Sequence, residues 1–220
     1  MKKGLSKEQL AARAAREVKD GMYVNLGFGI PALVAEYLAG RDVVLHTENG
    51  IIGMGPMAKK GEGDPDIINA TKQPVTIVPG GAIVSQSDSF MIIRGGHLDM
   101  TFLGAFQVSE KGDLANWKVP GEDNIPGMGG AMDLAVGTKS IVVTMTHTDK
   151  DGTPKILKEC TFPLTGQKCV SLIVTDLAVI RVTDKGLVLE ETAPGFTAAD
   201  IQKLTAVDLI ISPTLKEIAV

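Results

Sequence analysis

Short apolar segments that run directly into glycine recur along this chain, and they restrict its fold more than any other feature. Residues 22–26, 43–47 and 75–79 are such segments, and each leads into a glycine pair or an Asn-Gly pair. Apolar runs of this length are typical of buried strands, and glycine permits the tight turns that follow them. Open α/β sheets present ligand-binding groups at turns of this kind. The pattern therefore predicts several strand ends that converge on one face.

Helical patterns lie between these segments. Ser6 is a plausible N-cap for a helix over residues 7–19, and Pro31 suits the first turn of a helix over 32–38. Because the second helix would connect two strands, residues 22–47 predict a βαβ unit, with Gly27, Gly29 and Glu48 at the same edge of the sheet.

The rest of the chain adds strands, two further helical segments and no interdomain linker. Thr197 is a predicted N-cap, and residues 177–182 and 186–191 resemble a β-hairpin. The remaining predicted elements are strands over 75–82, 100–104, 141–146 and 172–175, a helical turn over 132–136 and a helix over 197–204. We therefore expect an α/β fold, a single domain over residues 1–220 with a mixed, largely parallel sheet flanked by helices.

Composition excludes several classes of function. The chain has 220 residues, of which 44% are hydrophobic and 22% charged, and a formal net charge of -4. A net negative charge argues against binding to nucleic acid or to anionic membranes as the main activity. Residues 1–10 lack an apolar signal core, and Cys160 and Cys169 lack metal-site partners. We expect reduced thiols, no metal, no membrane contact and a cytoplasmic location.

Glu48 is the candidate catalytic residue. His46, His97 and His147 lie in separate segments without metal-ligand spacing, and the chain contains no G-x-S-x-G serine elbow. A glutamate with a reference pKa of about 4.3 is ionised at neutral pH and can attack without a general base. On this fragment alone, a solvent-exposed Glu48 beside an ordinary Asn-Gly turn is the favoured interpretation.

A family resemblance bears on that choice. Thr47-Glu48-Asn49-Gly50 resembles the signature of the β subunit of 3-oxoacid coenzyme A transferases. Further stretches that resemble the same family, in the same order, are residues 25–31 (NLGFGIP), 93–99 (IRGGHLD), 112–117 (GDLANW), 127–134 (GMGGAMDL) and 163–166 (PLTG). The resemblance therefore extends over nearly the whole chain and implies a CoA-transferase-like fold.

The resemblance implies a double displacement in which Glu48 is the nucleophile and a glutamyl-CoA thioester is the covalent intermediate. The amide of Gly129 or of Gly130 is the implied oxyanion donor, and either fits. Arg94 could serve an anionic group or brace the turn after it. The implied substrate- and CoA-binding residues are Asn25, Gly27, Gly29, Asn49 and Lys72, although Lys72 could equally be a solvated surface lysine.

The resemblance also implies a partner and a substrate class. The family's β chain works with an α subunit, so we expect a heteromer that uses a coenzyme A thioester as substrate and holds no tightly bound cofactor. Residues 104–107 and 121–126 favour 3-oxoadipate slightly over acetoacetate as the acid that accepts CoA from succinyl-CoA. Alternatives are an acetate- or butyrate-acetoacetate transferase subunit and, more remotely, a sugar-phosphate isomerase or a ligand sensor of the same fold.

Overall fold

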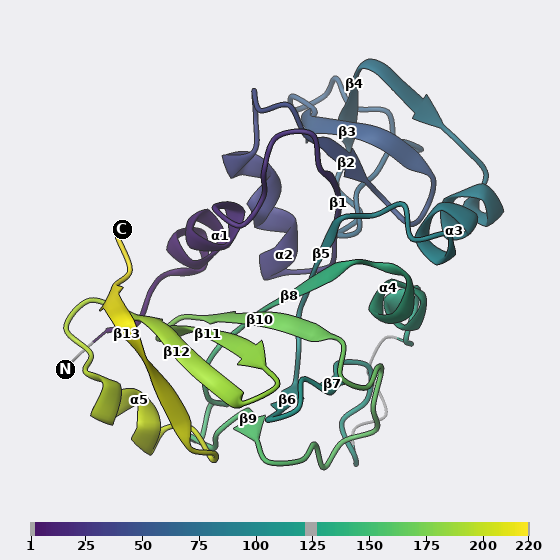
Figure 1. Ribbon diagram of the computed structural model, residues 1–220. Helices are drawn as coiled ribbons and strands as arrows, with labels where there is room; N and C mark the ends of the chain where they lie inside the picture. Colours follow the sequence, from purple (N-terminus) through teal and green to yellow (C-terminus); the bar gives the residue numbers. More distant parts are fainter. Residues whose placement is uncertain (1–2, 122–126, 220) are drawn as a thin grey trace.

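The computed structural model describes residues 3–121 and 127–219 (Figure 1). Within these residues, a ten-stranded sheet has the order β13-β12-β11-β10-β8-β5-β1-β2-β3-β4, and a smaller sheet has the order β7-β6-β9. The strands are β1 (Tyr23–Leu26), β2 (Val44–His46), β3 (Ile51–Met57), β4 (Val75–Ile83), β5 (Met100–Leu103), β6 (Gln107–Ser109), β7 (Leu114–Ala115), β8 (Ser140–Met145), β9 (Ile156–Leu157), β10 (Val170–Thr175), β11 (Ala178–Thr183), β12 (Gly186–Thr192) and β13 (Leu209–Glu217). The helices are α1 (Lys7–Ala15), α2 (Ile30–Leu33), the 3₁₀ helix η1 (Val34–Tyr37), α3 (Gln86–Arg94), α4 (Ala131–Gly137) and α5 (Ala198–Lys203).

The centre of the large sheet is parallel, and each flank contains one reversed strand. Strands β2, β1, β5, β8 and β10 run in one direction. Strands β3 and β11 run against them, and β4, β12 and β13 return to the central direction. Parallel strands in the centre place the ends of β1, β2 and β5 at a common edge. This arrangement confirms the expected mixed, largely parallel sheet.

Two apolar cores, one on each face, hold the sheet between its helices. Along β8, Ile141 and Val143 pack into the core under α3, α4 and α5, whereas Val142 packs into the core under α1 and α2. Alternate side chains of a strand point to opposite faces, so a continuous apolar run fits a strand covered on both sides. Figure 1 shows α3 beside α4, apart from α1 and α2.

The predicted βαβ unit is present at the N-terminal end of this sheet. Strand β1 pairs in parallel with β2, with Asn25 opposite His46, and α2 with η1 forms the crossover. Pro31 lies in the first turn of α2, as predicted. The first helix also begins as predicted, with a Ser6 capping box, but α1 ends at Ala15.

The structure also contains elements that the sequence analysis did not name. The apolar run at residues 90–94 lies on a helix, α3, whose N-cap is Ser85. Strand β13 at the C-terminal edge of the sheet was not predicted, because most of its side chains are exposed and it lacks a buried apolar pattern.

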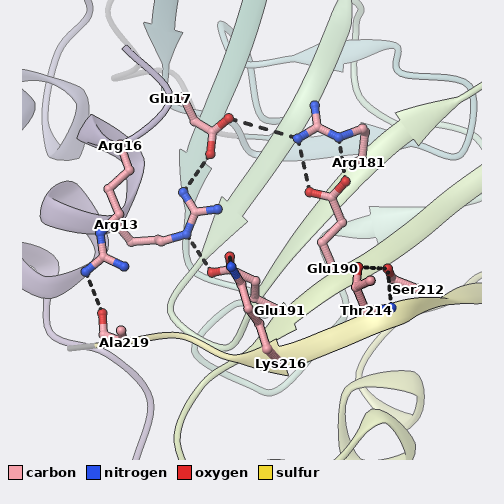
Figure 2. Close-up of polar contacts among 10 residues, drawn as sticks. All are labelled: Arg13, Arg16, Glu17, Arg181, Glu190, Glu191, Ser212, Thr214, Lys216 and Ala219. Atoms are coloured by element: carbon pink, nitrogen blue, oxygen red, sulfur yellow. Dashed lines mark hydrogen bonds and ion pairs between the residues drawn. The ribbon is translucent and has the colours of Figure 1, made fainter. Parts of the chain in front are cut away.

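A buried ion pair joins α1 to the antiparallel flank of the sheet (Figure 2). Arg13 and Glu191 are each 6% exposed, and the Arg13 Nε donates to Glu191 Oε2 at 2.6 Å. Glu17 accepts a second bond from Arg13 at 2.7 Å, and Lys216 on β13 lies 3.4 Å from Glu191. Charges removed from water require partners, so these contacts fix where α1 packs.

We predict that Arg13→Leu lowers the free energy of unfolding by about 3–5 kcal/mol, because it leaves Glu191 buried without its main partner. Lys139, whose exposed side chain forms an ion pair with Asp99 at 2.8 Å, provides the control. Lys139→Ala should cost no more than about 1 kcal/mol. Urea unfolding measures both values, and equal losses in the two variants would contradict the prediction.

Candidate active site

Glu48 lies in a tight turn at the end of β2. The Gly50 amide donates to the Thr47 carbonyl at 3.0 Å, and the Ile51 amide donates to Thr47 Oγ1 at 3.0 Å. Gly50 has φ +114°, and a Cβ at this position would overlap the Val84 carbonyl, so only glycine fits. The turn leads directly into β3, which runs antiparallel to β2. The chain therefore delivers Glu48 from a strand end, as the apolar run before it indicated.

The carboxylate of Glu48 contacts the start of α4. The Gly130 backbone amide donates a hydrogen bond to it, and a Cβ at Gly130 would overlap Glu48 Oε2. Burial raises the pKa of Glu48, the Gly130 hydrogen bond opposes this, and the negative charge of Asp133 raises the pKa further. Of the two glycines left open by the sequence, Gly130 is the one whose amide reaches Glu48 here. A Cβ at Gly129 would lie 3.4 Å from Oε1.

Arg94 braces α3 against α4. Its Nε donates to Asp133 Oδ1 at 2.6 Å, and its guanidinium lies 5.6 Å from the centre of the Phe90 ring. Of the two roles left open for Arg94, this geometry fits bracing, but between two helices rather than within the turn after it. Because Asp133 influences Glu48, the ion pair also bears on the charge near the carboxylate.

The glycine loop after β1 contains two glycines with different surroundings. The Gly27 amide donates to the Phe102 carbonyl at 2.9 Å, and a Cβ at Gly27 would lie 2.9 Å from the same oxygen, so this residue allows close packing on β5. Gly29 has φ +83°, and a Cβ there would meet no atom of the described residues within 4 Å. Gly27 is therefore a packing residue, whereas Gly29 borders open space.

The two asparagines expected to bind ligand are placed differently. Asn25 is 2% exposed, and its amide is bonded to His46 and Thr101, so it does not line an open surface of this chain. Asn49 is exposed, and its Nδ2 donates to the Ile68 carbonyl at 3.0 Å. Asn49 thereby ties the Glu48 turn to the segment that precedes Lys72.

Lys72 occupies the turn beside this contact. It has φ +61°, and its amide donates to the Asn69 carbonyl at 3.0 Å. Its side chain is exposed, and within residues 3–121 and 127–219 it has no hydrogen-bond or ion-pair partner. A lysine in this state is available to an anionic group. Residues 122–126, on which part of the preference for 3-oxoadipate rests, lie outside the described residues.

A comparison with protein families identifies the family of this chain. Residues 7–204 match the family described as Coenzyme A transferase. The chain belongs to the coenzyme A transferase family. This confirms the family resemblance and the class of enzyme that it implies.

Two relatives of the transferase chain differ in length. It is 53% identical to one subunit of the 3-oxoadipate CoA-transferase of Pseudomonas putida, over 94% of this chain and 98% of that protein. It is 54% identical to the mitochondrial succinyl-CoA:3-ketoacid coenzyme A transferase 2B of Mus musculus, over 96% of this chain but 41% of that protein. This chain therefore spans less than half of the mouse relative.

Solved structures share the fold of the transferase. The acyl-CoA transferase YdiF of Escherichia coli O157:H7 superposes with a TM-score of 0.76 and 25% identity, over 97% of this chain and 43% of that one. The glutaconate coenzyme A-transferase of Acidaminococcus fermentans gives a TM-score of 0.69 at 17% identity, over 97% and 89% of the two chains, which shows the fold alone.

Other features of the described residues carry less chemistry. Burial raises the pKa of both the Cys160 and the Cys169 thiols to about 11, which makes them poor nucleophiles. Within residues 3–121 and 127–219, no three His, Cys, Asp or Glu side chains are grouped so as to hold a metal ion. None of the helices described is both long and apolar enough to cross a membrane.

Sequence reasoning missed a buried polar cluster beneath Glu48. His46 is 1% exposed, and burial lowers its pKa to about 4, so its ring is neutral at pH 7. Ser89 on α3 contacts the ring and the Thr47 carbonyl. The position of His46, two residues before the candidate nucleophile, was visible in the sequence, but its partners lie on other segments.

Weak acid should destabilise the fold through His46 and His147. Burial, with a smaller effect of Lys155, lowers the pKa of His147 to about 4. An unfolded imidazole binds its proton near pH 6.5, so the unfolded state holds more protons between about pH 6.5 and 4. Stability is complete above this window and falls with pH inside it, by about 1.4 kcal/mol per unit for each histidine.

His147→Gln tests this. The difference in the free energy of unfolding between pH 7 and pH 5 should shrink by about 2 kcal/mol relative to the unmodified chain. Urea unfolding at the two pH values provides the measurement. An unchanged difference would show that His147 does not titrate below its ordinary range.

Proposed function

We propose that this chain is the β-type subunit of a transferase that moves coenzyme A between succinyl-CoA and a 3-oxo acid through a thioester formed on Glu48. The observation that carries the proposal is the half-buried Glu48 carboxylate, held in a tight turn with the Gly130 amide bonded to it. A carboxylate nucleophile and a backbone donor for an oxyanion are the two groups that attack on a thioester requires.

The first half-reaction has two attacks. A Glu48 carboxylate oxygen attacks the thioester carbonyl, the C–S bond breaks, and coenzyme A leaves as the thiolate, which gives a mixed anhydride. The thiolate then attacks the Glu48 carbonyl, and the first acid leaves as its carboxylate. The product is a glutamyl-CoA thioester. The carboxylate of the incoming acid repeats the steps in reverse and departs as the new acyl-CoA, so no water is consumed.

The environment of Glu48 supports this role. Because burial raises its pKa, the carboxylate is a more basic nucleophile than one in water. A positioned oxyanion donor is worth about 10²–10³ in rate, and the Gly130 amide lies beside the carboxylate where the tetrahedral oxyanion would form. Partial removal from water also protects an anhydride and a thioester from hydrolysis.

We assign the coenzyme A-binding groups by their exposure. Lys72 is an exposed cation beside the Asn49 contact and would meet an anionic part of coenzyme A. Gly29 borders open space and would admit the acyl group or the pantetheine arm. Gly27 and Asn25 would support the loop and the turn from within.

Identity does not choose the accepting acid, since the 3-oxoadipate and the succinyl-CoA:3-ketoacid relatives are 53% and 54% identical. We favour 3-oxoadipate over acetoacetate on residues 104–107 and 121–126. Initial rates with each acid, at equal succinyl-CoA, would decide between them.

We also propose an α-type partner subunit. The name of the Pseudomonas putida relative describes it as one subunit of its enzyme, and the mouse enzyme is more than twice as long as the matched region. The partner would supply the second oxyanion donor, so the chain alone should turn over slowly. A full rate without a partner would contradict this.

Glu48→Ala should abolish formation of the covalent thioester and lower turnover by at least about 10³-fold, because it removes the carboxylate that attacks. The complex with its partner would be incubated with acyl-CoA, and the thioester would be reduced with borohydride and located by mass spectrometry. Glu36→Ala provides a control on a carboxylate outside the site. A labelled peptide without Glu48, or activity retained in Glu48→Ala, would refute the mechanism.

Gly130→Ala should slow the reaction by about 10²–10³-fold, since its Cβ would overlap Glu48 Oε2 and displace the carboxylate from the amide. Gly127→Ala is the matched control, because a Cβ at Gly127 meets no atom within 4 Å among the residues that the structure describes. Single-turnover rates measure both. Equal rates in the two variants would remove Gly130 from the site.

A further inference from the structure

A directional chain of hydrogen bonds runs beneath the Glu48 turn. Asn25 Nδ2 lies 3.2 Å from the His46 carbonyl oxygen. A carbonyl oxygen can only accept a hydrogen bond, so the side-chain atom of Asn25 that faces it must be the amide nitrogen. The same nitrogen lies 3.2 Å from His46 Nδ1, which must therefore accept. A neutral ring then carries its proton on Nε2 and donates to Ser89 Oγ at 2.9 Å. The Ser89 hydroxyl in turn donates to the Thr47 carbonyl at 3.2 Å.

Thr101 holds the other end of this series of hydrogen bonds. The Thr101 hydroxyl on β5 donates to Asn25 Oδ1 at 3.1 Å, which holds the amide in the orientation described. All five residues of the cluster are buried. Buried polar groups whose partners are all satisfied rigidify their surroundings, whereas loss of one partner leaves another group unpaired away from water. The cluster therefore fixes the carbonyl that precedes Glu48.

Helix α3 also holds the opposite side of the site. Phe90, the residue after Ser89, approaches Gly130 so closely that a Cβ there would lie 3.0 Å from its Cζ. Arg94 is bonded to Asp133 of α4, and a Cβ at Gly137 would overlap the Ile93 carbonyl. The helix that contacts the Glu48 turn through Ser89 thus contacts both ends of α4, whose N-cap is Gly130.

We propose that His46 and Ser89 are positioning residues that hold the Glu48 carboxylate against the Gly130 amide, with α3 as the shared support of both groups. The inference rests on the proposed role of Glu48. Neither side chain touches the reacting atoms; their effect is to fix the Thr47 carbonyl and thereby the direction of the turn. A displacement of about 1 Å at such a site can cost about 10²-fold in rate.

Ser89→Ala tests the proposal in the complex with the partner subunit. It removes the donor to Thr47 and leaves the His46 Nε2 proton unpaired. Formation of the glutamyl-CoA thioester in a single turnover should slow by about 10–100-fold, while KM for the acyl-CoA stays within about twofold, because ligand-binding groups are untouched. A merely structural role would not lower the rate of the chemical step while KM stays unchanged.

Thr144→Val is the matched control. Thr144 is 1% exposed, and within the described residues its Oγ1 has no hydrogen-bond partner, so the variant removes an equally buried hydroxyl that positions nothing. Its thioester should form at the unmodified rate. Thioester formation that is as fast in Ser89→Ala as in the unmodified complex, or equally slow in Thr144→Val, would overturn the proposal.

His46 provides a rescue experiment. His46→Ala removes both ring contacts, whereas a glutamine amide nitrogen can reach the place of Nε2 and donate to Ser89. His46→Gln should therefore form the thioester at least about tenfold faster than His46→Ala. Equal rates in the two variants count against the proposal. Absence of any thioester in the unmodified complex would instead refute the proposed function itself.

Discussion

The hydrogen bond between the Gly130 amide and the Glu48 carboxylate is the interaction on which the site depends. It joins a turn between β2 and β3 to the start of α4, two segments far apart in the sequence. Burial alone would favour the neutral acid, and the amide offsets part of that cost while it directs the carboxylate. In the proposed mechanism the same two effects act on the nucleophile, because burial raises its pKa and the amide opposes that rise.

The fold separates the groups that stabilise the domain from those at the site. The ion pair between Arg13 and Glu191 fixes α1 on the antiparallel flank, among residues shown in Figure 2. The parallel centre carries Glu48 at the edge where its strands end. Between them the two apolar cores hold the sheet rigid, so small displacements at the turn are resisted by close packing.

Several elements were predictable because their signals are local. The Ser6 capping box, Pro31 in the first turn of α2 and the β11–β12 hairpin each depend on residues within a few positions of one another. Helix α3 was not predicted, because a short apolar run such as residues 90–94 fits either a strand or a helix. Strand β13 gives almost no buried pattern and depends on its neighbour β12.

The sequence by itself determined the βαβ unit and the position of Glu48 at a strand end, since strand patterns and turn chemistry are encoded by adjacent residues. Its motifs, through their resemblance to a known family, also indicated the family and the candidate nucleophile. Only the tertiary structure showed that the Gly130 amide is the one bonded to Glu48, that Asn25 is buried and that His46 lies beneath the turn. These outcomes depend on contacts among β1, β2, α3 and α4. Side chains that meet only after the chain has packed leave no local pattern in the sequence from which their contact could be predicted.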